Sequence, residues 1–166
     1  MTLKKSLSAI AAAVMLLALT ACEGGSEKAS DLDIKLNGVT VSAPFTVEKL
    51  GSDYSVGDAN FTIMCKNEIV AGVAFDKNST ESDYKKKRVS SLFSIADGGT
   101  KSVSVNGIVT GSTQSEVLKA IGDPWKKEEE PLCFWAYHED GKPDDDNYLV
   151  IFFNDNKVSS IVVKPG

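Results

Sequence analysis

The stretch that decides the expected fold is residues 105–125, VNGIVTGSTQSEVLKAIGDPW. Asn106-Gly107 is a turn dipeptide, and Thr113 with Glu116 three residues later makes a capping box at the start of a helix. The run GDP at 122–124 then supplies a glycine that can close the helix in a left-handed conformation and a proline that cannot continue it. We therefore expect the end of a strand, a turn, a capped helix and a stop.

The start of the chain has the pattern of a secretion signal. Lys4 and Lys5 form a basic region, residues 7–19 form a short apolar segment, and small residues lie directly before Cys22. This segment resembles the signal peptide and lipobox of bacterial lipoproteins, in which the cysteine takes a diacylglyceryl thioether and the signal is cut before it. The resemblance implies a signal peptide at 1–21 and lipidation of Cys22. The alternative, a transmembrane anchor, needs an apolar run of about 20 residues.

Lipidation defines where we expect the protein and what it contacts. Each buried methylene of an acyl chain contributes about 0.8 kcal/mol, so several chains on Cys22 make the membrane a permanent partner. Residues 22–31 are polar and rich in Gly and Ser, and they predict a flexible tether. We expect the domain on the cell membrane or outer membrane, facing the periplasm or the exterior. The net charge of −5 gives no footprint for nucleic acid.

Two cysteines besides Cys22 remain, in a compartment that permits disulfides. Cys65 and Cys133 each lie in a strand-like run, and they are either bonded to each other or two separate buried thiols. The sequence has no CxxC motif and one histidine, so its spacing predicts no metal site.

The rest of the chain is expected to be mainly strands. A short helical turn is expected at 46–50, and a charged link at 126–130. The expected strands are residues 32–36, 61–65, 69–75, 89–95, 101–105, 133–138, 148–153 and 158–163.

An internal repeat divides these elements into two halves. The turn at Asn37-Gly38 matches the one at Asn106-Gly107, and residues 67–73 match residues 156–161. We expect a first, degenerate repeat at 32–100 and a second repeat at 101–166.

The second half carries a family resemblance. The pattern runs through the capped helix, the aromatic residues 134–137, the strand at 148–153 and the turn at 156–158. It is similar to the SmpA/OmlA (BamE-like) lipoprotein domain and to the tandem repeats of β-lactamase inhibitor protein (BLIP). The resemblance implies an α+β fold of two repeats, each with one or more short helices packed on an antiparallel sheet. It also implies protein binding, as an assembly subunit or an enzyme inhibitor.

Catalytic chemistry is not expected. The only histidine, His138, is followed by two acidic residues that point to alternate faces of a strand, so they do not converge. Asp144, Asp145 and Asp146 form an oxygen-rich loop, but calcium loops alternate their ligands and include a glycine among them. A solvated hairpin tip is the stronger interpretation. We therefore expect no enzyme activity, no metal and no cofactor.

The aromatic residues of the second half are the remaining candidates. We expect Trp125 in the core, because tryptophan is ordinary core material. Trp135 and Tyr137 share one strand face that is either core or open to a partner. With Asp144–Asp146 they form the candidate partner surface. The leading hypothesis is a non-catalytic module that binds an envelope or extracellular protein. The alternatives are an enzyme inhibitor whose loop at 141–147 enters a cleft, and a small-ligand or cation-binding lipoprotein.

Overall fold

The computed structural model describes residues 32–42, 45–95, 102–136 and 148–164. Strands dominate this part of the chain, with one α-helix and one short 3-10 helix. The elements are β1 (Ile34–Leu36), β2 (Val39–Thr40), β3 (Phe45–Thr46), η2 (Val47–Leu50), β4 (Tyr54–Val56), β5 (Thr62–Cys65), β6 (Glu68–Phe75), β7 (Arg88–Phe93), β8 (Val103–Val105), α1 (Gln114–Ile121), β9 (Lys126–Glu129), β10 (Leu132–Ala136), β11 (Tyr148–Asn154) and β12 (Lys157–Lys164).

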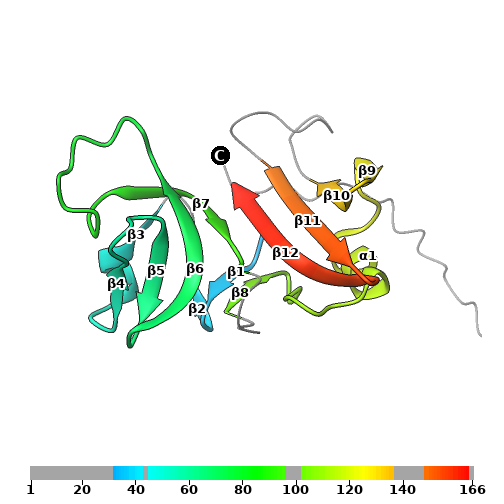
Figure 1. Ribbon diagram of the computed structural model, residues 1–166, viewed down its shortest axis with the longest axis horizontal. Helices are drawn as coiled ribbons and strands as arrows, with labels where there is room; N and C mark the ends of the chain where they lie inside the picture. The colour runs from blue at the N-terminus through cyan, green and yellow to red at the C-terminus, as the bar shows by residue number, and fades with distance from the viewer. Residues whose placement is uncertain (1–31, 43–44, 96–101, 137–147, 165–166) are drawn as a thin grey trace, which may run out of the picture.

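These strands form two antiparallel sheets. The small sheet has three strands in the order β2-β1-β8. The large sheet has nine strands: its path runs β4-β5-β6-β7-β12-β11-β10-β9, and β3 pairs with β7 beside this path. Figure 1 shows the first-half strands β3–β7 on one side of the molecule and β9–β12 on the other. Strands from the two halves therefore belong to one continuous sheet.

The two halves of the large sheet meet at a short seam between β7 and β12. Only two residue pairs form it, with Phe93 opposite Val162 and Leu92 opposite Val163. Beyond these pairs, Ser94 extends the contact: its backbone N–H donates to the Ile161 carbonyl, and its Oγ accepts from the Ile161 N–H, each at 2.8 Å. The seam is thus closed by a side chain where the strand pairing ends.

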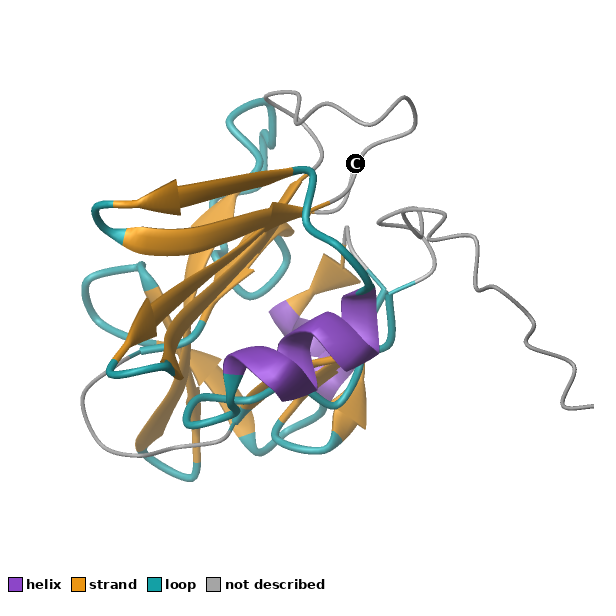
Figure 2. Ribbon diagram, turned by 90° about the vertical axis from the view of Figure 1, so that its right-hand side faces the viewer, coloured by secondary structure: helices purple, strands orange, loops and turns teal. Residues whose placement is uncertain are grey.

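One hydrophobic core lies between the inner face of the large sheet and the elements that cover it. The sheet contributes fully buried residues such as Leu149, Ile151 and Ile161. Leu36 of the small sheet and Val117 of α1 belong to the same cluster and are also fully buried. Figure 2 shows α1 lying across the strands. The small sheet therefore does much of the covering that helices were expected to do.

The predicted α+β fold of two BamE/BLIP-like repeats, each with helices packed on a sheet, is wrong. The structure is β-rich, and α1 is the one α-helix among the described residues. In the first half, the short helical turn expected at 46–50 forms as η2, four residues long, with Val47 as its buried residue. η2 is followed by Gly51, whose φ of 109° is readily adopted by glycine and rarely by other residues. A helix this short cannot cover a sheet.

The helix at the centre of the sequence analysis forms as expected. The Thr113 side chain accepts a hydrogen bond from the Glu116 N–H, and Glu116 Oε2 accepts from the Thr113 N–H at 2.7 Å. The helix ends at Gly122, which has a φ of 74°. Val117 and Ile121 are its buried residues. The capping box and the glycine stop are therefore confirmed.

Two hairpins, one in each half, share the same construction. Both turn residues have positive φ: 50° and 68° at Lys66 and Asn67, and 49° and 60° at Asp155 and Asn156. Each hairpin has a register shift that leaves one residue unpaired in the strand after the turn, Val70 in β6 and Ser159 in β12. The hairpins thus match residue by residue. Such a match is what a duplicated unit would have, and the division into repeats at 32–100 and 101–166 stays a prediction.

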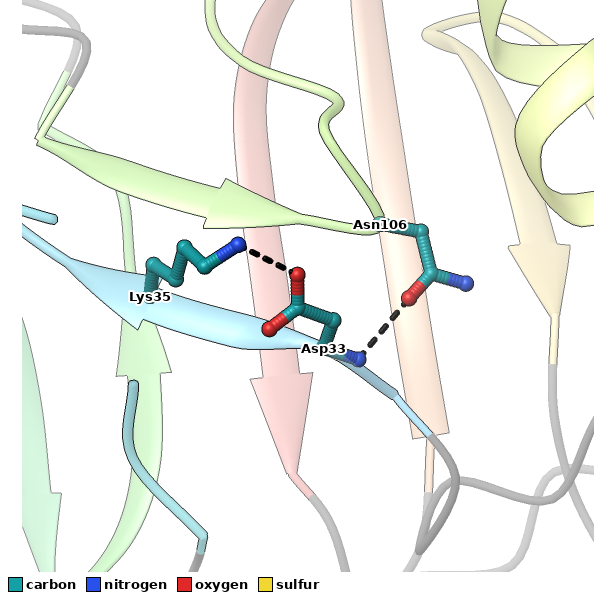
Figure 3. A network of polar contacts seen from close by, with 3 residues as sticks. All are labelled: Asp33, Lys35 and Asn106. Carbon is teal, nitrogen blue, oxygen red and sulfur yellow. Dashed lines mark hydrogen bonds and ion pairs between the residues drawn. The ribbon is translucent and has the colours of Figure 1, made fainter. Parts of the chain in front are cut away.

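The small sheet joins the two halves through equivalent turns. Asn37 and Asn106 both have a φ of 50°, and each precedes a positive-φ glycine. Asn106 Oδ1 accepts from the Asp33 N–H at 2.9 Å, and its own N–H donates to the Asp33 carbonyl at 3.0 Å. Figure 3 shows this contact together with the ion pair between Asp33 and Lys35. The second-half turn is therefore fastened to the first strand of the domain.

Candidate functional site

The outer face of the large sheet, on the side away from the core, carries a row of apolar side chains. Register pairs connect Phe93 to Val162, Val162 to Val150, and Val150 to Trp135. Residues directly opposite each other in an antiparallel sheet lie on the same face and contact each other. Four strands, β7, β12, β11 and β10, therefore build one apolar row across the sheet. We call these four residues and Phe152 the outer face.

A glycine sets the position of the first aromatic ring. Gly72 on β6 lies opposite Phe93 in the register. A Cβ atom at Gly72 would come within 1.7 Å of Cε2 of Phe93. The ring thus occupies the space that a side chain at position 72 would fill, and it extends the apolar row over β6.

A second row lies one step along the strands. Ser160 pairs with Phe152, Phe152 with Cys133, and Cys133 with Glu128. Cys133 and Val150 are 1% and 3% exposed, yet neither belongs to the main core cluster. They lie on the side of the sheet away from that core. The outer face is thus an apolar layer of its own, with Phe93, Phe152 and Val162 half-buried.

Trp135 stands near the end of this layer. Its ring centroid lies 6.2 Å from that of Tyr148, at an interplanar angle of 57°. Its indole Nε1 is buried and has no hydrogen-bond partner of good geometry among the described residues, yet it lies close enough to Glu128 and Cys133 to help lower the pKa of each. Its neighbour Phe134 points to the opposite face and packs on Phe153, at 4.6 Å between ring centroids. The strand therefore turns Phe134 into the core and Trp135 onto the outer face.

Charged residues of β9 border the outer face. Lys126 lies opposite Trp135, and its ammonium forms an ion pair with Glu128. The hydrogen bond from Lys126 holds the pKa of the Glu128 carboxyl below its ordinary value. Burial raises the pKa of the Cys133 thiol, and the negative charge of Glu128, to which Cys133 Sγ donates at 3.6 Å, raises it further. The thiol is thus kept protonated and weakly nucleophilic.

The two cysteines are free in the structure, and both are buried. Cys65 on β5 belongs to the main core, whereas Cys133 on β10 lies beside Phe152, on the same side of the sheet as the outer face. Four strands separate β5 from β10, which corresponds to roughly 24 Å in a flat sheet. A disulfide needs Cα atoms within about 7 Å. Of the two interpretations, the geometry fits separate buried thiols.

Most of the other predicted site residues fall in parts of the chain that the structure does not describe. Cys22, Tyr137, His138 and Asp144–Asp146 lie outside the described residues. Trp135 is therefore the one member of the candidate partner surface that the structure places. The inhibitor and cation-binding alternatives both depend on the acidic loop, so they stay predictions.

The expected core position of Trp125 is wrong. Its side chain is 48% exposed, because it follows the helix stop and precedes the edge strand β9. Phe61 is exposed at 67% and Ile69 at 46%. None of these side chains is among the five residues of the outer face, although Ile69, which pairs with Met64, lies on the same side of the sheet.

Other kinds of site find little support in the described ranges. A shallow pocket of about 330 Å³ lies between the Asn106-Gly107 turn and α1, but the side chains of Asn106, Ser112 and Glu116 on its wall already bond to the backbone. Among the described residues, no three His, Cys, Asp or Glu side chains gather where they could hold a metal ion. The described ranges also contain no helix with the length and hydrophobicity of a membrane span.

No protein-family model, no curated protein and no solved structure matches the chain. The resemblance to BamE-like and BLIP repeats therefore stays a prediction for the second-half sequence, without support from these comparisons.

Sequence reasoning found part of the outer face and missed the rest. Trp135 was placed on a strand face that is either core or open to a partner, and a strand was expected at 148–153, where β11 lies. Phe93 and Val162 were missed, because their importance depends on the pairing of β7 with β12. The signal available was alternation: Phe93, Phe152 and Val162 each lie next to a residue that is buried in the core.

Proposed function

We propose that this protein is a lipid-anchored, non-catalytic module that binds another envelope protein through the outer face. The observation that carries the proposal is the second apolar layer, formed by Trp135, Val150, Phe152, Val162 and Phe93 on the side of the sheet away from the core. A sheet with one solvated face normally presents polar side chains there. Contiguous apolar residues with an aromatic anchor and a charged border are typical of protein interfaces.

The proposed anchor complements this face. Lipid on Cys22 would hold the domain at a membrane, so the domain needs no membrane-binding surface of its own. The outer face then serves for contact with a protein. The charged β9 residues at its border would exclude water from the apolar centre, as the polar rim of an interface does.

The test is photo-crosslinking of the full chain in its own cell envelope. A photoreactive residue at position 160, beside Phe152 in the register, should capture a partner at a defined mass. The variant F152S/V162S should lose that product, because it removes two apolar contacts from the outer face. L118S is the matched control, since Leu118 is 38% exposed and lies on α1. A folded F152S/V162S variant that still captures the partner would refute the proposal.

The anchor needs a separate test. Cells fed a labelled fatty acid should incorporate it into the wild-type chain and not into C22A. The C22A protein should also leave the membrane fraction. Retention of both label and membrane association in C22A would overturn lipidation at this position.

A further inference from the structure

The free edge of the large sheet has an unusual charge order. β9 ends the sheet path, and its partner β10 lies on one side only. Its sequence is Lys126-Lys127-Glu128-Glu129. Among the described edge strands it is the longest, with four residues against two in β2 and three in β4 and β8. An exposed edge offers unpaired backbone N–H and C=O groups to another strand.

Symmetry limits how this edge can meet a copy of itself. A two-fold axis perpendicular to the sheet keeps each side chain on the same face in both copies. Because side chains alternate along a strand, residues that face each other must then be separated by an even number of positions. The pairing is therefore centred on a residue, and the two possible centres are Lys127 and Glu128.

The pairing centred on Glu128 is rich in unlike charges. It places Lys127 opposite Glu129 of the second copy, and Lys126 opposite Glu130, each twice by symmetry. The single like pair is Glu128 with its own copy, and each Glu128 already accepts a hydrogen bond from Lys126 of the same chain. The pairing centred on Lys127 has only the two Lys126–Glu128 contacts. Its like pair is Lys127 with its own copy, and each Lys127 already forms an ion pair with Glu129 of the same chain. Charge complementarity therefore selects the centre at Glu128.

We propose that β9 pairs antiparallel with β9 of a second copy, with Glu128 at the two-fold axis. Charges on an edge strand ordinarily prevent sheet association, and a run of one sign does so by repulsion. β9 carries both signs at a spacing of two residues, which is complementary to itself in an antiparallel pair. The side chains of Lys127 and Glu129 are 48% and 73% exposed, so they are accessible to a second copy.

A charge-swap series measures this pairing directly. The full chain is studied in detergent by sedimentation-equilibrium ultracentrifugation, in a solvent whose density is matched to that of the detergent. K127E or E129K alone creates two like pairs across the axis and should weaken dimerisation by about tenfold or more. The double variant K127E/E129K reverses both charges and restores unlike pairs, so its dimer should return to wild-type strength. It also keeps the ion pair within β9 in reversed form.

Controls separate the edge from general charge effects. K66E and E68K make the same charge changes on the exposed hairpin between β5 and β6, and they should leave the dimer unchanged. A wild-type chain that is monomeric up to its solubility limit would overturn the proposal. Single reversals without effect, or a double variant that stays as weak as the single ones, would overturn it as well. The measurement needs no other protein, so its result is independent of the proposed partner.

Discussion

The ring of Phe93 lies where the side chain of residue 72 would be, because Gly72 has none. The G72A substitution would force the ring out of the outer face, since the added Cβ would lie 1.7 Å from Cε2. Overpacking of this kind costs about 1–3 kcal/mol. We expect G72A to lower the free energy of unfolding by that amount in urea titrations of the full chain.

A second variant shows whether the ring is the cause. G72A/F93A removes the atoms that the new Cβ would meet, so it should be more stable relative to F93A than G72A is relative to wild type. If G72A lowers the free energy of unfolding by the same amount in the wild-type and F93A backgrounds, the Phe93 ring is not the cause of the loss.

The capping box at Thr113 is expected to stabilise the only α-helix of the described chain. In this box Thr113 Oγ1 accepts from the Glu116 N–H, and Glu116 Oε2 accepts from the Thr113 N–H. T113A removes the first acceptor and should lower the free energy of unfolding by about 1 kcal/mol. Chemical denaturation measures the loss. S115A is the matched control, because Ser115 is exposed and lies in the same helical turn; an equal loss in S115A would contradict a capping role.

The thiols of Cys65 and Cys133 should both be free and slow to react in the folded protein, because both are buried. After denaturation without reductant, mass spectrometry should find alkylation at both positions. A peptide in which they are joined would contradict the fold. E128Q removes the charge that helps raise the pKa of Cys133, so this variant should react faster at Cys133 and unchanged at Cys65.

The lowered pKa of Glu128 predicts a dependence of stability on pH. In the unfolded chain the carboxyl returns to its ordinary value of 4.5, so its contribution is fully present above pH 4.5. That contribution is lost as the pH falls below 4.5 through the folded pKa. K126M removes the hydrogen bond that is the main cause, and an NMR titration should find the Glu128 pKa raised. An unchanged pKa in K126M would show that Lys126 is not the cause.

Local signals predicted many of the individual elements, though not the fold class. Thr113 and Glu116 predict the start of the helix. The two Asn-Gly turns predict a positive φ, and both asparagines have a φ of 50°. Most strands were expected within a few residues of where they lie. These features depend on neighbours in the sequence, because caps and turns are satisfied by residues three or four positions away.

Features that depend on distant contacts could not be predicted in this way. Residues 126–129 were expected to be a charged link, and they form β9 because β10 offers them an edge, which overrides their low strand propensity. The expectation that helices cover the large sheet was also wrong. It rested on the family resemblance, whereas the long-range pairing of β1 with β8 forms the small sheet that does much of the covering. The outer face exists only through the registers of β10, β11, β12 and β7, and Phe93 joins it through the pairing of β7 with β12.

The short seam between β7 and β12 has a mechanical consequence. Two residue pairs and the Ser94 contacts hold the large sheet together there, whereas the hairpins on either side pair along most of their length. Under strain the molecule should bend at this line while each half keeps its own pairing. Because the outer face crosses it at Phe93 and Val162, bending there would change the curvature that a bound protein meets.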